Sequence, residues 1–227
     1  MTLAVTGVLF GATAHAAWPG LAGPYVGGQV MGAQPSMTIE DSDCWYNCSA
    51  YTQRKLGAML GVQGGFNWIS GNLLLGGELE YNFGSIKKEF QYGYYTGPQD
   101  NMKLTSKLKN LGSLRLKMGL VSNDTAVAVS VGPATGKFEG EFRDQNNNFN
   151  PADDDVASQS GNMSGFVYGI GAEHALTPNL LIGLKYSKYK FTDKTATVHT
   201  PAGVNTGSLV KFVNDADTFA LGVNWSF

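Results

Sequence analysis

The sequence predicts an all-β fold, an eight-stranded antiparallel up-and-down transmembrane β-barrel. Apolar and polar residues alternate with a period of two in one segment after another, which is typical of strands. Glycine supplies 30 of the 227 residues and aromatics supply 11%, spread along the chain, as many strands and turns require. Charged residues in the middle of these segments share the polar face. Because a membrane barrel turns apolar side chains toward lipid and polar ones toward its lumen, the combination favours such a barrel.

Composition and net charge limit the classes of protein to which the sequence can belong. With 43% hydrophobic and 15% charged residues, the chain suits one soluble domain or one small barrel. After the amino terminus no apolar run approaches the length of about eighteen residues that a membrane-spanning helix needs. The net charge of −2 gives no reason to expect a nucleic-acid partner, and no aromatic and basic stripe is present.

Residues 1–17 have the pattern of a secretory signal peptide. An apolar run from Leu3 to Phe10 precedes Ala14-His15-Ala16, a small-x-small cleavage pattern. We expect removal of this segment, which leaves residues 18–227 as the barrel domain. The basic residue that usually precedes the apolar run is missing, so we expect the leader to start upstream. The alternative is a short buried helix or strand.

The first four strands are predicted over residues 24–33, 54–68, 73–83 and 110–121. Glycines in the first of them leave the facing of Tyr25 open. The other three alternate clearly, so one face of each is expected to meet lipid. Their lipid-facing positions are Leu56, Ala58, Leu60, Val62, Phe66, Trp68, Leu73, Leu75, Leu79, Tyr81, Phe83, Leu114, Leu116, Met118 and Leu120.

The last four strands are predicted over residues 126–132, 165–174, 180–191 and 217–227. The first of them ends at Pro133, where we expect a bulge or an early end of pairing, because proline removes one ladder hydrogen bond. The last strand alternates to its final residue, an aromatic one. The lipid-facing positions are Val127, Val129, Val131, Phe166, Tyr168, Ile170, Ala172, Ile182, Leu184, Tyr186, Phe219, Leu221, Val223, Trp225 and Phe227.

Short and long connections alternate strictly along the chain. The predicted tight turns are residues 70–72, 122–125 and 176–179, and the predicted long loops are residues 34–53, 87–106, 139–160 and 192–210. Both termini then lie beside the short turns. In outer-membrane barrels the short turns are periplasmic, so we expect periplasmic termini and extracellular loops. A soluble barrel of the lipocalin kind is the alternative, but its strands should be apolar inside.

Six charged residues are predicted to face the lumen: Glu78, Glu80, Arg115, Lys117, Glu173 and Lys185. The strand that carries the first two acids neighbours the strand that carries Arg115 and Lys117. Opposite charges in a narrow interior would stabilise one another and block water and ions. The alternative use of these charges is a gated, ion-selective pathway.

Aromatic residues near the strand ends predict two interfacial girdles. The turn-side girdle would contain Phe66, Trp68, Trp225 and Phe227, and the loop-side girdle would contain Tyr81, Phe83, Phe138 and Tyr186. Ordinary core packing is the alternative. Above the loop-side girdle, Lys87, Lys88, Lys188 and Lys190 are either contacts for lipopolysaccharide phosphates or solvated loop charges.

The predicted loops contain two further features. Cys44 and Cys48 would form a local disulfide in an oxidising compartment and shape a loop tip. A metal site there would need more ligands, and His199 is the one histidine that might join. The acidic run from Asp153 to Asp155 suits a solvated tip better than a calcium site. No metal and no cofactor is therefore predicted.

Several short motifs occur in a defined order between residues 18 and 227. They are Trp18 with Pro24-Tyr25-Val26-Gly27, then Gly76-Gly77-Glu78, residues 112–119 (GSLRLKMG), residues 169–173 (GIGAE) and the terminal aromatic strand. In this order they resemble the small outer-membrane β-barrel family related to opacity proteins and the OmpA transmembrane domain.

The resemblance implies an abundant envelope protein that supports membrane integrity and presents loops to hosts, phages or surfaces, in some members as an adhesin. Its implied partners are outer-membrane lipid and lipopolysaccharide, an unidentified extracellular ligand, and the outer-membrane assembly machinery acting on the last strand. No peptidoglycan-binding segment follows that strand, so tethering to the cell wall is not expected.

Three functions are weighed on this basis: a structural and surface-interaction barrel, a narrow channel, and an outer-membrane enzyme such as a lipid A modifier or protease. Catalysis needs a nucleophile or base clustered with its partners at one rim. His174 and His199 are predicted at opposite ends of a spanning strand and cannot share a site. The prediction is therefore a non-enzymatic barrel with no catalytic residues, and the channel is the alternative.

Overall fold

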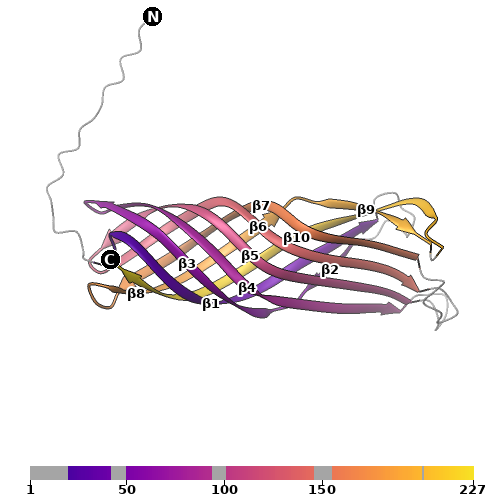
Figure 1. Cartoon of the computed structure of the whole chain (residues 1–227), viewed down its shortest axis with the longest axis horizontal. Helices are drawn as coiled ribbons and strands as arrows, with labels where there is room; N and C mark the ends of the chain where they lie inside the picture. Colours follow the sequence, from indigo (N-terminus) through magenta and orange to yellow (C-terminus); the bar gives the residue numbers. More distant parts are fainter. Residues whose placement is uncertain (1–19, 42–49, 94–100, 146–154, 201) are drawn as a thin grey trace, which may run out of the picture.

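The computed structural model describes residues 20–41, 50–93, 101–145, 155–200 and 202–227, which form one antiparallel barrel (Figure 1). The ring consists of β1 (Gly23–Asp41), β3 (Gly57–Ser70), β4 (Leu73–Gly93), β5 (Asn101–Ser122), β6 (Thr125–Gln145), β7 (Asp155–Ala175), β8 (Leu180–Phe191) and β10 (Asn205–Ser226). Pairing of β1 with β10 closes it. The short strands β2 (Ala50–Arg54) and β9 (Lys194–His199) precede β3 and follow β8. The predicted eight-stranded antiparallel barrel is confirmed.

The three tight turns lie together at one end of the barrel, beside the start of β1 and the carboxy terminus (Figure 1). The turn between β3 and β4 uses Gly71 at φ 58°, and the turn between β5 and β6 uses Asn123 at φ 51°. These left-handed backbone values suit glycine and asparagine. The described part of the chain contains no helix that is long and apolar enough to cross a membrane.

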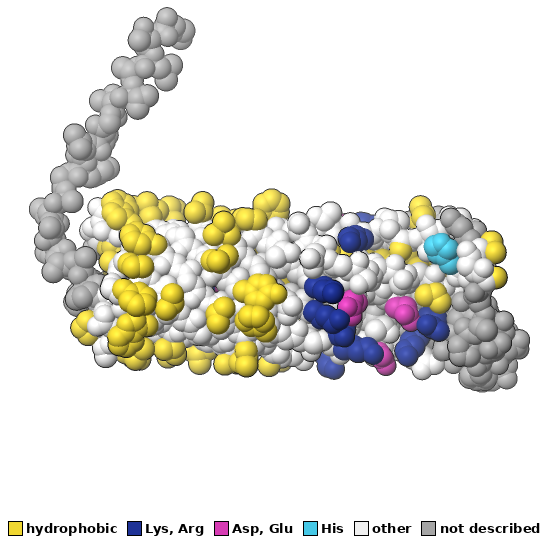
Figure 2. Space-filling model, in the orientation of Figure 1, with side chains coloured by type: hydrophobic (Ala, Val, Ile, Leu, Met, Phe, Trp, Pro, Cys, Tyr) yellow, Lys and Arg dark blue, Asp and Glu magenta, His cyan; other side chains and the backbone are white. Residues whose placement is uncertain are grey.

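The half of the wall nearer these turns is coated with apolar side chains, and charged side chains begin at about mid-length (Figure 2). The predicted lipid-facing residues stand outward here, as Leu116 does with 72% of its surface exposed. Glu78 and Arg115 on the same strands are buried. Oily residues outside and charged residues inside are the reverse of a soluble barrel, so the lipocalin alternative is wrong.

Beyond the apolar band the strands continue much further than predicted. The predicted loops at 34–53, 87–106, 139–160 and 192–210 are mostly strand, including β2, β9 and the ends of β1, β4, β5, β6, β7 and β10. Their alternation is reversed: Leu104 and Phe142 point inward and are buried, while Lys103 and Glu141 point outward. Apolar residues inside and charged residues outside are the pattern of a sheet whose outer face meets water. A search for apolar outward faces therefore predicts these strands as polar loops.

A β-bulge at Asn110 changes which face of β5 points into the barrel, so that one strand fits the opposite alternation of the two halves. Asn110 has φ 52°, and the register with β6 shifts between Lys109 and Leu111. Below the bulge the odd-numbered side chains of β5 face the lumen, as Arg115 does, and above it the even-numbered Leu108 does. The extra residue therefore exchanges the two faces of the strand, as a bulge does.

In the half of the barrel beyond the apolar band, which we call the projecting half, backbone hydrogen bonding is incomplete between β2 and β4. Among the described residues β2 pairs with β1 alone, and the pairing of β4 with β3 stops at Phe83. Side chains bridge this seam: Lys55 Nζ donates to the carbonyl oxygen of Lys87, and Lys88 Nζ donates to that of Arg54, each at 2.7 Å. A second seam lies between β7 and β9, which pair only where Val156 meets His199.

Two four-stranded sheets therefore face one another above the band, β2-β1-β10-β9 and β4-β5-β6-β7. Apolar side chains from both fill the space between them: Met37, Ile39, Val198, Val210 and Phe212 from the first sheet, and Leu104, Phe142 and Ala157 from the second. This packing holds the projecting half together where backbone pairing is missing.

The expectation for Pro133 is wrong. Pairing between β5 and β6 is interrupted opposite Gly132 and Pro133, but it resumes in the same register at Ala134 and, beyond the bulge at Asn110, continues to Gln145. On its other side Pro133 remains paired in register with Phe166 of β7. The backbone N–H that Pro133 lacks therefore affects pairing only at that position, because β5 and β6 are hydrogen bonded over long stretches on both sides of the gap.

Candidate functional site

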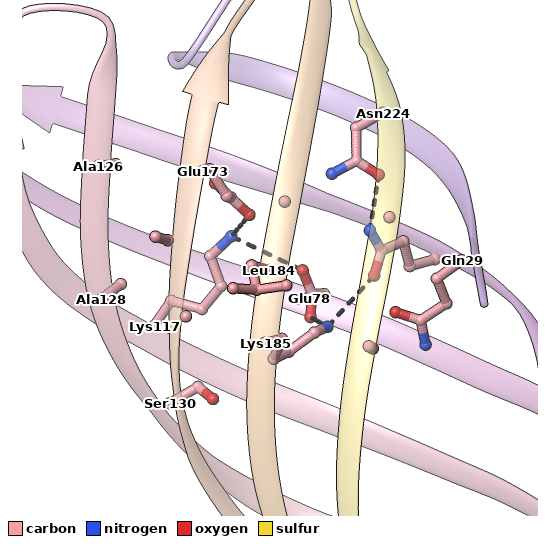
Figure 3. A pocket seen from close by; sticks show the side chains of 16 residues that line it. Gln29, Glu78, Lys117, Ala126, Ala128, Ser130, Glu173, Leu184, Lys185 and Asn224 are labelled. Carbon is pink, nitrogen blue, oxygen red and sulfur yellow. Dashed lines mark hydrogen bonds and ion pairs between the residues drawn. The ribbon is translucent and has the colours of Figure 1, made fainter. Parts of the chain in front are cut away.

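The lumen of the membrane-spanning half is the candidate functional site, because it gathers charged groups that are costly to bury. The structure brings all six predicted lumen charges together. They form five ion pairs: Arg115–Glu80 at 3.4 Å, Lys117–Glu78 at 3.7 Å, Lys117–Glu173 at 2.8 Å, Lys185–Glu78 at 2.5 Å and Lys185–Glu80 at 2.7 Å. Three cations face three carboxylates, so the cluster is neutral. Figure 3 shows four of the six: Glu78, Lys117, Glu173 and Lys185.

Arg115 is the most enclosed cation of the cluster, with 1% of its surface exposed. Its guanidinium donates to Ser187 Oγ at 2.6 Å, to Tyr189 OH at 2.6 Å and to Ser113 Oγ at 2.9 Å, besides contacting Glu80. A buried charge is tolerated only when its donors are satisfied in this way. β4, β5 and β8 all contribute to this one guanidinium, so it links strands around the ring.

Two tyrosines that the sequence analysis did not assign complete the network. Tyr25 OH donates to Glu78 at 2.7 Å and accepts from Lys117 Nζ at 3.0 Å. Tyr189 OH donates to Glu80 at 3.0 Å. Tyr189 lies on the same odd-numbered face of its strand as Lys185, so the sequence could have predicted that it faces the lumen. The inward position of Tyr25 could not be predicted, because the glycines near it blur the alternation.

A cavity of about 40 Å³ lies beside the ion pairs. Gln29, Glu78, Lys117, Glu173 and Lys185 line one side, and small residues line the other, including Ala126, Ala128 and Ser130 (Figure 3). A water molecule needs roughly 10–15 Å³ by this measure, so the space suits a few waters. The polar layer is thus filled mostly by its own side chains.

Apolar layers cover the polar layer at both ends. Toward the turns the lumen is filled by Leu21, Leu74, Val121, Ala126 and Leu181. Toward the projecting half it is filled by a larger cluster that includes Met31, Met59, Leu108, Phe138, Val167 and Phe191. An ion that reached the polar layer would first have to cross one of these packed layers.

Phe138 was predicted in the loop-side girdle, and that prediction is wrong. The residue is 3% exposed, and its ring packs edge-on against Phe191 with centroids 4.7 Å apart. The even-numbered face of β6 points inward from Ala126 to Asp144, so Phe138 belongs to the lumen. The other seven girdle residues lie exposed on the outer wall, and their interfacial role stays a prediction: Phe66, Trp68, Tyr81, Phe83, Tyr186, Trp225 and Phe227.

The remaining predicted features do not form a site in the described residues. His174 contacts Thr125 at the turn end, and His199 lies on β9 at the other end, as predicted. No group of three or more His, Cys, Asp or Glu side chains in the described ranges could hold a metal. The predicted signal segment, Cys44, Cys48, Asp153 and Asp154 lie outside the described residues.

Comparisons with known proteins agree with this geometry. A family model described as outer membrane protein beta-barrel domain matches residues 1–227, and no curated protein sequence matches the chain. The chain is similar in structure to OprG from Pseudomonas aeruginosa, with a TM-score of 0.56, 15% identity and coverage of 92% of this chain and 98% of OprG.

Two further structures show lower similarity. The outer membrane protease OmpT from Escherichia coli gives a TM-score of 0.50 at 8% identity, covering 91% of this chain and 97% of OmpT. The attachment invasion locus protein Ail of Yersinia pestis gives 0.42 at 13% identity, covering 91% of this chain and 99% of Ail. At such identities OprG and OmpT support the fold alone.

Proposed function

Since the chain belongs to the outer membrane protein β-barrel domain family and lies in a bacterial outer membrane, we propose that it is a non-enzymatic envelope protein that carries surface loops on a projecting stalk. The observation that carries this proposal is the filled interior. Packed apolar layers, a neutral ion-pair layer and the projecting core fill much of the interior of the described barrel. Such a barrel suits anchoring and presentation better than transport.

The proposal includes an orientation, with the tight turns and termini in the periplasm and the long strands outside. Outer-membrane barrels have short periplasmic turns and longer extracellular connections, which supports it. The projecting strands then extend well above the membrane, and adhesion or ligand contact would take place at their far end. The assembly machinery is the proposed partner of the aromatic terminal strand.

Orientation is tested on whole cells with single cysteines. After Cys44 and Cys48 are replaced by serine, Ser158→Cys on the exposed outer face of β7 is expected to react with a membrane-impermeant maleimide. Asn123→Cys in a tight turn is expected to react only after the cells are permeabilised. Labelling of Asn123→Cys alone on intact cells would contradict the orientation.

A narrow channel is the second candidate, favoured by the ring of lumen charges. The apolar layers above and below those charges argue against it, because a packed apolar constriction excludes water and ions. Catalysis has less support, since His174 and His199 lie at opposite ends of the barrel and neither contacts a carboxylate in the described residues.

Planar-bilayer recording separates the plug from the channel. We expect the purified protein to show no steady conductance, because the six lumen charges neutralise one another within a closed layer. Glu80→Ala and Arg115→Ala serve as matched variants that remove opposite charges from one pair. Steady conductance of the unaltered protein that Glu80→Ala abolishes or Arg115→Ala alters would replace the plug by a conducting pathway.

A further inference from the structure

The chain covers the turn-end mouth of the barrel before it enters β1. We define the strap as residues 20–22, which precede β1 at the end where the tight turns lie (Figure 1). Leu21 of the strap is 1% exposed although it belongs to no ring strand. It packs in one apolar cluster with four wall residues: Leu74 of β4, Val121 of β5, Ala126 of β6 and Leu181 of β8. None of these four strands pairs with β1, so Leu21 reaches beyond its own side of the ring and into the mouth.

Two glycines direct the strap into the mouth. Gly20 has φ 120° and Gly23 has φ 98°, which glycine adopts freely and other residues adopt only under strain. A Cβ atom on Gly20 would lie 2.8 Å from the carbonyl oxygen of Pro178, in the turn between β7 and β8. On the ring, β10 separates this turn from β1. The strap therefore extends over the mouth and rests closely against a turn that is not adjacent to its own strand.

Side chains hold the strap in place, and one of them also contacts a lumen charge. Asn67 Nδ2 donates to the carbonyl oxygen of Leu21 at 3.1 Å and to Glu173 Oε2 at 3.3 Å. Ser226 Oγ donates to the carbonyl oxygen of Ala22 at 3.4 Å. The ladders that join β1 to β3 and β10 begin after the strap. The strap can therefore lift while the ring stays closed.

The cavity of the polar layer lies directly behind the strap. Ala126 belongs to the apolar layer that Leu21 completes, Ala128 packs against that layer, and both line the cavity. Across the cavity from them lies Gln29, which is 5% exposed (Figure 3). Its Oε1 atom accepts no hydrogen bond from the described residues. A buried carbonyl group needs a donor, and an enclosed water molecule commonly supplies one, so the cavity selects water as its ligand.

We propose that residues 20–22 are a releasable strap, which closes the turn-end mouth over a water-filled chamber and lets its water exchange when it lifts. The chamber is the cavity of about 40 Å³, which has room for roughly three water molecules. The larger apolar layer beyond the ion pairs stays packed in both states, so the water exchanges with one side of the membrane only. Assignment of that side to the periplasm rests on the proposed function, whereas the closure itself does not.

The test follows a cysteine inside the chamber of the protein in which Cys44 and Cys48 are replaced by serine. Ala128→Cys places a thiol in the chamber lining, and Ala134→Cys places one on the same strand in the larger apolar layer. The folded protein in detergent micelles is treated with hydroxyethyl methanethiosulfonate, a small, neutral and water-soluble reagent. We expect slow modification at position 128 and none at position 134 over the same time, measured by mass spectrometry.

Two variants lift the strap by different means. Leu21→Ser removes its apolar anchor and is expected to speed modification at position 128 by roughly tenfold to a hundredfold. Gly20→Ala strains the backbone of the closed strap and is expected to speed it by roughly tenfold.

Each strap variant has a matched control at the same end of the barrel. Leu120→Ser changes a leucine that is 67% exposed on the outer wall. Gly71→Ala changes a turn glycine at φ 58° whose Cβ position has no atom within 4 Å. Both controls are expected to change the rate at position 128 by less than about twofold.

The water is observed by NMR of the unaltered protein in micelles. Transfer of magnetisation from water to the side-chain amide of Gln29 is expected, because a water that donates to Oε1 lies beside that amide. The side-chain amide of Asn214, which is completely buried and does not line the chamber, is expected to show none. Absence of transfer at Gln29 would overturn the water assignment.

Folding of each variant is checked by its gel migration before and after boiling, and Gly20→Ala carries the test alone if Leu21→Ser does not fold. The closure is overturned if the controls accelerate modification as much as the strap variants, if position 134 becomes as reactive as position 128, or if no folded strap variant reacts faster. Modification of Ala128→Cys in the otherwise unaltered protein as fast as that of the exposed Ser158→Cys would also overturn it. Strap variants are expected to remain without steady conductance, so failure of the strap and failure of the proposed function are distinguishable.

Discussion

Arg115→Met is expected to destabilise the barrel by about 3 to 5 kcal/mol, the cost of removing one partner of a buried ion pair. Glu80 keeps its contact with Lys185, but the lumen cluster is left with three carboxylates and only two cations. Arg115 and Glu80 are both almost completely buried, and the guanidinium also satisfies Ser187 and Tyr189. Methionine fills much of the same volume, so loss of charge and hydrogen bonding dominates. Urea unfolding in lipid vesicles, followed by the gel shift between folded and boiled forms, measures the change.

The double variant Glu80→Gln, Arg115→Met supplies the decisive comparison. Removing the carboxylate charge along with the guanidinium is expected to restore most of the lost stability, because no uncompensated charge then remains at that pair. Arg143→Met removes the same side chain from the outer wall and is expected to change stability by less than about 0.5 kcal/mol. A double variant no more stable than Arg115→Met would show that the ion pair is not the source of the effect.

Deletion of Asn110 is expected to have the largest effect on folding. Without the bulge, the upper part of β5 would turn over by one face, because the side-chain period of a strand is two. Lys107 and Lys109 would then point into the apolar interior, while Leu104 and Leu108 would face water. Burying two lysines among apolar side chains costs several kcal/mol each, so the projecting half should not form.

The measurement is again gel migration, together with labelling of a cysteine at position 107. The deletion is expected to lose the compact SDS-resistant form, and any folded fraction should protect Lys107→Cys from a polar maleimide. Asn110→Gly is the control, since glycine accepts φ 52° at least as well as asparagine and keeps the bulge. A stable deletion variant with unchanged labelling at position 107 would contradict the role assigned to the bulge.

Much of the lumen network was predictable because it depends on strand-to-strand adjacency along the chain. Glu78 and Glu80 are next to the strand of Arg115 and Lys117, so their proximity followed from a single hairpin. Lys185 reaches both acids from the far side of the lumen, at 2.5 Å and 2.7 Å. That contact depends on the width and shear of the closed ring, which local alternation does not report.

The sequence by itself determined the number of ring strands, the tight turns and which face of each membrane-spanning strand meets lipid, because alternation and turn residues are local properties. Tertiary structure alone decided how far the strands project, why Phe138 is inside and where the ladder opens beside β2. The physical reason is that the medium outside a residue, lipid or water, depends on its height along the barrel axis. The same alternation has opposite meanings on the two sides of that boundary, and Asn110 marks it on β5.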